Sequence, residues 1–198
     1  MALLDWITPE SGLSLQGQAV RLRAPRWRDY PAWSNLRQVS RDFLQPWEPV
    51  WPEDDLERAA YRRRLATYAR EMDAGSAYPF FIFRTCDDAL VGGVTISNIR
   101  RGVAQMCTIG YWMGQPYAGQ GHMTAALKPL VAFAFGELGL HRVEAACLPE
   151  NEASHRLLIK SGFREEGMAC AYLKINGRWR DHLLFGMVRP GPAVGGES

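Results

Sequence analysis

The chain has 198 residues, of which 47% are hydrophobic and 22% are charged. This composition is that of an ordinary globular protein and excludes the disordered and membrane-spanning classes. The net charge of +2 is too small to indicate binding of nucleic acid through overall charge. At this length we expect one domain over residues 1–188, followed by a disordered tail rich in Gly and Pro over 189–198.

The cysteines and the amino-terminal residues indicate in which cellular compartment the protein is expected. Cys86, Cys107, Cys147 and Cys170 form no C-x-x-C pair and have no His at zinc-ligand spacing, so we interpret them as reduced and structural and predict no metal site. No apolar run approaches the ~18 residues of a membrane span, and residues 1–6 lack the basic start of a signal peptide. For a bacterial chain, these features predict a cytoplasmic protein that does not associate with membranes.

The first 72 residues predict one short strand at 20–23 and two helices at 29–39 and 53–72. The second helix is amphipathic, with Leu56, Ala60, Leu65 and Tyr68 near one face. Its arginines lie largely off that face. We interpret these arginines, and those between residues 21 and 28, as solvated surface, with contact to RNA as the alternative.

Between these two helices, residues 43–52 combine three prolines with Trp47 and Trp51. Because proline removes a backbone donor and clashes inside a helix, the segment predicts a stiff loop without helix. The two tryptophans offer large flat surfaces that either line a substrate pocket or cap the core. Trp47 and Trp51 are therefore candidate substrate-binding residues.

The rest of the chain alternates between strand and helix patterns. Three apolar segments have the spacing of an antiparallel meander, and Asn176-Gly177 is the strongest hairpin signal. The expected strands lie at 78–84, 90–98, 103–113, 143–148, 168–175 and 178–188, and the expected helices at 124–138 and 151–160. The element order is β-α-α-β-β-β-α-β-α-β-β.

A glycine-rich loop, Ala118-Gly119-Gln120-Gly121-His122-Met123, joins the third strand of the meander to the helix that follows. Glycines allow a sharp turn and close approach to a ligand, and the free N–H groups of a helix start point at negative charge. The loop therefore predicts a cradle for a pyrophosphate. On shape alone, a purely structural turn is the alternative.

Several motifs in this order resemble those of a known family. The glycine loop, the segment Leu148-Pro149-Glu150-Asn151-Glu152-Ala153-Ser154 and the helix stop Ser161-Gly162-Phe163 resemble the GNAT superfamily of acetyl-CoA-dependent N-acetyltransferases. Further stretches, at 43–51, 110–112, 141–145, 172–177 and 181–182, are similar to its RimJ/RimL branch, most of all to the RimJ type. The resemblance covers about residues 20–188.

This resemblance implies an α/β (α+β) fold with a mixed central sheet, helices on both faces, and fourth and fifth strands that splay apart around the pantetheine arm of acetyl-CoA. The pantetheine adds to the first strand of this opening, and the glycine loop receives the pyrophosphate. The implied cofactor-binding residues are Tyr111, Trp112, Met113, Gly119, Gln120, Gly121, His122, Met123, Thr124 and Asn151. Asn151 either bonds the pantetheine or only caps the helix that it begins.

The glycine loop departs from the superfamily pattern Q/R-x-x-G-x-G/A. Aligned at 118–123, its first and last positions deviate, although Gly121 is retained. A shifted frame at 116–121 matches the two glycines as well. Because the cradle uses backbone donors and both frames keep the same amides facing the phosphates, we expect cofactor binding in either case.

Acetyl transfer to an amine requires a neutral nucleophile, a stabilised oxyanion and a proton for the departing thiolate. Many relatives carry a general-acid Tyr seven residues after the Asn, and this position is Leu158 here. Ser154 becomes the candidate acid, as the RimL-like branch implies; its alternative role is a hydrogen bond near the helix start. Glu144 is the candidate base by position, and its alternative role is an ion pair with a nearby arginine.

The small number of candidate catalytic bases bears on which amine accepts the acetyl group. RimJ-like proteins often carry a carboxylate before the Gly-Tyr-Trp stretch and another inside the cofactor helix. Here these two positions are Thr108 and Ala125. Neutralising an α-amine of pKa about 7.7 to 8.0 at pH 7 costs only about 1 to 1.4 kcal/mol, whereas a lysine of pKa about 10.4 costs roughly 4.6 kcal/mol. A site with poor base equipment therefore suits an N-terminal amine.

This agrees with what the RimJ likeness implies, namely direct acetylation, in a ternary complex, of the N-terminal alanine of a small-subunit ribosomal protein. The implied partner is the N-terminus of that protein, with ribosome association left open and no sequence-specific binding of nucleic acid. Two other functions are kept as alternatives. One is acetylation of a small amine or antibiotic, and the other is a ribosome-associated factor that binds CoA with little catalysis.

Overall fold

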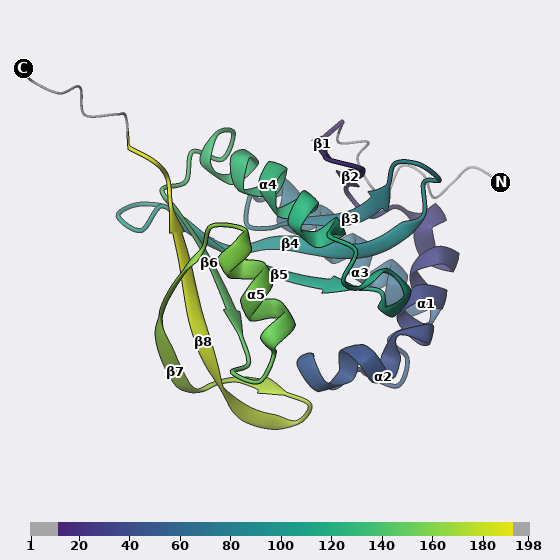
Figure 1. The fold of residues 1–198 in the computed structure, drawn as a ribbon. Coiled ribbons are helices and arrows are strands. Elements are labelled where there is room, and N and C mark those ends of the chain that lie inside the picture. The colour runs from purple at the N-terminus through teal and green to yellow at the C-terminus, as the bar shows by residue number, and fades with distance from the viewer. Residues whose placement is uncertain (1–11, 192–198) are drawn as a thin grey trace, which may run out of the picture.

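The computed structural model describes residues 12–191, and in them eight strands form one sheet (Figure 1). The strands are β1 Ser14–Gly17, β2 Val20–Arg23, β3 Tyr78–Arg84, β4 Leu90–Arg100, β5 Met106–Met113, β6 Arg142–Cys147, β7 Arg164–Ile175 and β8 Arg178–Val188. The helices are α1 Tyr30–Val39, α2 Arg41–Leu44, α3 Arg58–Asp73, α4 His122–Phe135 and α5 Glu152–Lys160. The strand order is β1-β2-β3-β4-β5-β6-β8-β7.

Helices cover both faces of the sheet, as predicted. In Figure 1, α4 and α5 lie in front of the sheet and α3 lies behind it. Side chains of β3 alternate between two cores, because successive residues of a strand point to opposite faces. Phe80 and Ile82 belong to the core under α4 and α5, whereas Phe81 and Phe83 pack with α1 and α3. This double burial explains why β3 is almost continuously apolar.

The sheet opens between β5 and β6. These two strands are parallel and pair at only three positions, Met106 with Arg142, Cys107 with Val143 and Thr108 with Glu144. Beyond Thr108, β5 remains paired with β4 as far as Met113, and β6 remains paired with β8 as far as Cys147. The predicted splay of two neighbouring strands is therefore confirmed, and it leaves the β6-facing edge of β5 without a partner strand.

The amino-terminal half contains two elements that differ from the prediction. Strand β1 is not predicted at all, since only Leu15 among its four residues is a buried hydrophobic side chain. The loop at 43–52 is predicted without helix, which is wrong, because α2 and a 3₁₀ turn at Gln45–Trp47 occupy its first part. Pro46 lies in the first turn of that 3₁₀ helix, where a missing N–H costs nothing.

Other elements differ in where they begin. Helix α3 begins at Arg58 instead of residue 53, since residues 53–56 form turns. Strand β5 begins three residues late because the preceding turn contains Gly102 and Gln105 at φ +65° and +41°. Strand β7 begins four residues early, at Arg164, and pairs through a register shift at Gly167. The predicted hairpin at Asn176-Gly177 is confirmed.

Further predictions are met only in part. All four cysteines are free, but Cys86 and Cys170 are exposed, so the structural interpretation is correct only for the buried Cys107 and Cys147. Between residues 12 and 191, no helix has the length and apolar character needed to cross a membrane. Residues 189–191 lie outside any helix or strand, and the rest of the predicted tail, 192–198, lies outside the described residues.

A buried ion pair joins β2 to the start of α1. Both Asp29 carboxylate oxygens accept hydrogen bonds from the Arg23 guanidinium at 2.7 Å, and the backbone N–H of Arg26 donates a third. The two side chains are only 7% and 5% exposed, and the guanidinium lies 4.0 Å from the centre of the Phe83 ring. Breaking such a pair leaves an uncompensated charge in the interior.

The substitution Asp29→Asn preserves the shape of the side chain but removes the charge that holds Arg23. We expect it to lower the free energy of unfolding by about 3 to 5 kcal/mol. The matched change Asp88→Asn, in the exposed pair with Arg21, should alter the same quantity by less than about 0.5 kcal/mol. Urea unfolding monitored by circular dichroism measures both, and equal effects would contradict the structural role of Asp29.

Candidate active site

The glycine loop presents a row of backbone donors to open space. Gly119 and Gly121 adopt φ of +74° and +83°, and Gly121 is the N-cap of α4. No acceptor within residues 12–191 pairs with the six N–H groups from Gly119 to Thr124, and the first backbone bond at the helix start is donated by Ala125. A Cβ built on either glycine meets nothing within 4 Å. This geometry fits an anion at the start of α4.

Charged and polar side chains next to the loop add to this fit. The Arg84 guanidinium lies 5.2 Å from the ring centre of Tyr117 and is paired with Asp87 at 2.7 Å. Burial, and secondly the nearby Arg84, lower the pKa of His122. The His122 Nε2 atom is itself buried and has no hydrogen-bond partner among the described residues. An anionic ligand at the loop would therefore meet positive charge and an unused polar atom.

The opening between β5 and β6 contains two hydroxyl groups in contact. The Tyr111 side chain reaches from β5 towards α5, and its Oη lies 2.7 Å from Ser154 Oγ. The Cys147 thiol, at the end of β6, also faces Ser154: burial raises the pKa of this thiol, and a hydrogen bond with Ser154 opposes the increase. Burial likewise raises the pKa of Tyr111 above its usual value. Ser154, on α5, therefore contacts a side chain from each of the two diverging strands.

Asn151 fixes the start of α5. Its Oδ1 accepts the backbone N–H of Ser154 at 3.1 Å, so the N-cap interpretation is confirmed. No hydrogen bond among the described residues engages its side-chain nitrogen, which leaves that donor free for a ligand. The same residue thus places the Ser154 backbone and retains a donor near the opening.

Glu144 forms an ion pair with a nearby arginine, which is the alternative role predicted for it. Its carboxylate accepts a hydrogen bond from Arg142 Nε at 2.8 Å, and Arg142 also binds Glu166. Glu144 lies opposite Thr108, where the pairing of β5 with β6 ends. The contact with Arg142 lowers the pKa of Glu166. Arg142 therefore links two carboxylates at the closed end of the opening.

The aromatic segment, residues 43–52, is linked to β5 through Arg37, a residue that the sequence did not single out. Arg37 and Glu48 form a bidentate ion pair with both bonds at 2.7 Å, and Trp51 Nε1 donates to the same carboxylate at 2.7 Å. The Arg37 guanidinium lies 4.0 Å from the ring centre of Trp51 and 5.1 Å from that of Trp112. Stacking of a guanidinium on aromatic faces is favourable, so these contacts hold Trp51 beside β5.

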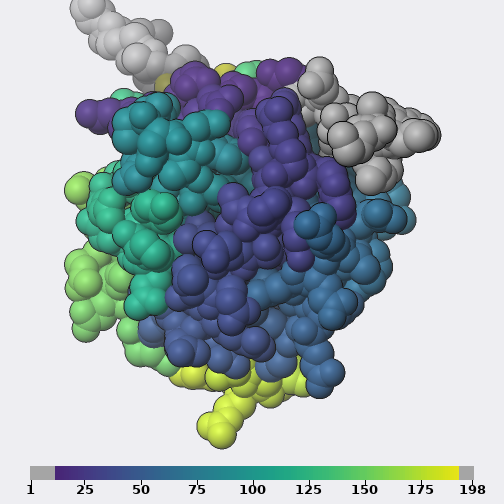
Figure 2. Space-filling model, turned by 90° about the vertical axis from the view of Figure 1, so that its right-hand side faces the viewer, coloured from purple at the N-terminus to yellow at the C-terminus, as the bar shows by residue number. Residues whose placement is uncertain are grey.

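The candidate residues of this segment are not part of the two cores. Among the described residues, neither core cluster includes Trp47 or Trp51, and both side chains are half-buried. The backbone N–H of Asn176 donates to the Glu48 carbonyl at 2.9 Å. In Figure 2 the yellow-green tip of the β7–β8 hairpin accordingly lies below the blue residues of this region. The segment and the hairpin tip therefore form one continuous surface.

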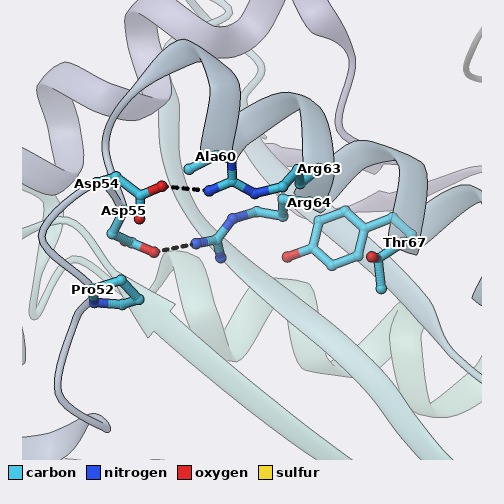
Figure 3. A pocket seen from close by; sticks show the side chains of 8 residues that line it. Pro52, Asp54, Asp55, Ala60, Arg63, Arg64 and Thr67 are labelled. Carbon is cyan, nitrogen blue, oxygen red and sulfur yellow. Dashed lines mark hydrogen bonds and ion pairs between the residues drawn. The ribbon is translucent and has the colours of Figure 1, made fainter.

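A separate hollow of about 310 Å³ lies beside α3 (Figure 3). Ion pairs of Asp54 with Arg63 and of Asp55 with Arg64 cross it, and the Asp55–Arg64 distance is 2.6 Å. Its lining includes none of the predicted site residues. Within residues 12–191, no cluster of three or more metal-ligating side chains is present.

Residues 19–164 match the protein family described as acetyltransferase (GNAT) domain. The chain is a GNAT acetyltransferase. The predicted family, the α/β fold and the activity of an acetyl-CoA-dependent N-acetyltransferase are therefore confirmed. The glycine loop and the opening between β5 and β6 are two places where backbone groups have no partner among residues 12–191.

Relatives of this GNAT protein lie in the predicted RimJ/RimL branch. Ribosomal protein uS5-alanine N-acetyltransferase of Escherichia coli is 35% identical over 186 residues, which cover 92% of this chain and 93% of that protein. "Probable N-acetyltransferase YjcK" of Bacillus subtilis is 35% identical over 176 residues, covering 89% and 97%. The solved structure of Mycobacterium smegmatis RimJ in complex with CoA-disulfide has a TM-score of 0.82 and 36% identity, covering 89% and 86%.

The glycine loop generates a prediction about CoA affinity. Gly121→Ala places a Cβ on a left-handed residue, which costs roughly 1 to 2 kcal/mol unless the loop changes conformation and re-aims its N–H groups. We expect the Kd for CoA, measured by calorimetry, to rise about tenfold or more.

The matched control is Gly102→Ala, in the turn between β4 and β5. Gly102 also has a positive φ, +65°, and also has open space around its Cβ position. This variant should lose similar stability while its Kd for CoA changes less than about twofold. A similar Kd for both variants would show that the loop does not hold the co-substrate.

Proposed function

We propose that this GNAT enzyme acetylates the N-terminal α-amine of a ribosomal protein whose first residue is alanine. The observation that carries the proposal is similarity over nearly the whole chain to an enzyme named for alanine acetylation of ribosomal protein uS5. Mycobacterium smegmatis RimJ, with a TM-score of 0.82, supports the same assignment. We place the reaction in the cytoplasm, with the protein N-terminus as partner and the ribosome as the larger assembly that presents it.

Each part of the site has a proposed task in holding acetyl-CoA. The N–H groups from Gly119 to Thr124 bind the pyrophosphate, and the free edge of β5 from Tyr111 to Met113 bonds the pantetheine amides as a strand would. The Asn151 side-chain nitrogen adds a further donor. When bound, the co-substrate supplies an acetyl group activated by a thiol leaving group.

Ser154 is the proposed proton donor to the departing sulfur. Its hydroxyl lies in the first turn of α5 and contacts Tyr111 of β5, and the Asn151 cap fixes its backbone. Glu144 is held by Arg142, so we do not assign the base role to it. The acceptor loses its proton to solvent instead, and this suits an α-amine because its neutral form is accessible at neutral pH.

The proposed acceptor approaches over the surface formed by the aromatic segment and the hairpin tip. Arg37 and Glu48 hold Trp51 beside β5, and Asn176 joins the hairpin to the same segment. Trp47 and Trp51 provide half-buried aromatic area for the first side chains of the incoming peptide. A small first residue such as alanine suits an amine that must come close to the opening.

The acceptor assignment is tested with a peptide that copies the N-terminus of the cognate uS5 protein, begins with alanine and contains a lysine. Incubation with acetyl-CoA should release free CoA and place one acetyl group on the α-amine, as located by tandem mass spectrometry. The rate at low peptide concentration should increase as pH rises through about 7.7 to 8.0, because the neutral amine becomes more abundant.

The matched control is the same peptide with a blocked α-amine and a free lysine, and it should release no CoA. Release from the blocked peptide, or from small amines but from no Ala-initiated peptide, would contradict the proposed acceptor.

The proton-donor role of Ser154 gives a second test. Ser154→Ala should lower kcat by about 100-fold while the Kd for CoA changes less than about twofold, since general acid catalysis contributes to the chemical step. Ser161→Ala is the matched control, because Ser161 ends the same helix and its hydroxyl has no partner among the described residues. Its kcat should stay within about twofold of wild type, and an equally unchanged kcat in Ser154→Ala would remove Ser154 from the mechanism.

A further inference from the structure

Tyr111 meets the proposed proton donor with its side chain, although sequence reasoning assigns it only a backbone role. It lies on β5 three residues beyond Thr108, the last position at which β5 pairs with β6. Its ring packs against the core under α4 and α5, and its Oη lies 2.7 Å from Ser154 Oγ. The two residues are 43 positions apart in the chain.

The direction of this hydrogen bond follows from what each hydroxyl can reach. Among the described residues, Ser154 Oγ is the one hydrogen-bond partner found for the Tyr111 hydroxyl. A desolvated O–H that donates to nothing is costly, so we assign the phenol as the donor in this part-buried pair. Burial also raises the pKa of Tyr111, which keeps the phenol protonated and able to donate.

Once the phenol donates to Ser154 Oγ, the hydrogen of the serine is free to point elsewhere. The serine backbone is already fixed, because its N–H is bound to Asn151 Oδ1. Leu158, one turn further along α5, is fully buried and carries no polar group. Asn151 therefore fixes the serine backbone, the Tyr111 phenol donates to the serine oxygen, and the serine hydrogen is left to donate to a sulfur, as the Cys147 thiol that also faces Ser154 is placed to accept.

We propose that Tyr111 is a positioning residue that donates its phenol O–H to Ser154 and thereby directs the Ser154 hydroxyl hydrogen at the departing sulfur. This inference rests on the proposed role of Ser154. As the carbon–sulfur bond breaks, its electron pair goes to sulfur and the Ser154 proton follows. The amine nitrogen forms the new bond to the acetyl carbon and loses a proton to solvent, and solvent returns a proton to Ser154 Oγ. The Tyr111 O–H bond stays intact throughout.

The test is a double-mutant cycle on kcat with the Ala-initiated peptide. Tyr111→Phe removes one oxygen and keeps the ring, so kcat should fall about three- to tenfold, while KM for acetyl-CoA changes less than about twofold. In the Ser154→Ala background, the same change should have less than about a twofold effect, because the serine that Tyr111 orients is gone. Tyr78→Phe, a half-buried tyrosine of β3, is the matched control and should leave kcat unchanged.

Each outcome bears on one of the two proposals. If the wild-type enzyme acetylates no Ala-initiated peptide but does turn over another amine, the proposed acceptor fails, and the cycle is measured with that amine. An unchanged kcat in Tyr111→Phe, or an equal loss with and without Ser154, would overturn the role of Tyr111.

A second variant covers the case in which Tyr111→Phe does not fold. Fluorotyrosine at position 111 keeps the ring and makes its O–H a stronger donor, so kcat should be retained at or above the wild-type value. Thermal melting and the Kd for CoA show whether each variant is folded. A folded fluorotyrosine enzyme with a kcat reduced more than about threefold would also overturn the proposal.

Discussion

The short pairing between β5 and β6 is the constraint on which the site depends. Three paired positions hold the strands together, and each strand then follows its other neighbour, β4 for β5 and β8 for β6. Backbone groups left unpaired inside a protein cost free energy, so such an edge persists where a ligand, water or a side chain can pair with it. The backbone arrangement alone thus leaves a free strand edge on β5, which is where we propose that the pantetheine binds.

Elements on both faces of the sheet contact this opening. On one face, α4 and α5 cover it, and the Asn151 cap and the left-handed Gly121 determine where those helices begin. On the other face, Arg37 connects Trp112 of β5 to the aromatic segment through Trp51 and Glu48. Contacts from both sides of the sheet therefore position the site, so a small displacement of either layer of helices would change its geometry.

Features set by local turn chemistry could be predicted from the sequence. The glycine loop and the Asn176-Gly177 hairpin depend on residues that are adjacent in the chain, as does the helix cap at Asn151. Contacts between distant segments could not, because Tyr111 with Ser154 and Arg37 with Glu48 depend on strand register and helix placement. One signal was available. Ile109 and Tyr111 are two residues apart in a strand and therefore lie on the same face, which places the phenol on the side of the core helices.

The length of the hydrogen bond between Tyr111 and Ser154 depends on the width of the opening between β5 and β6. One oxygen belongs to β5 and the other to the helix that follows β6, so their 2.7 Å separation depends on how far apart the two strands lie. A ligand thicker than an extended chain would wedge the strands apart and break the bond. On the proposed role of Tyr111, such a ligand would bind without an oriented serine hydroxyl, and the width of the opening would then contribute to the choice of acetyl donor.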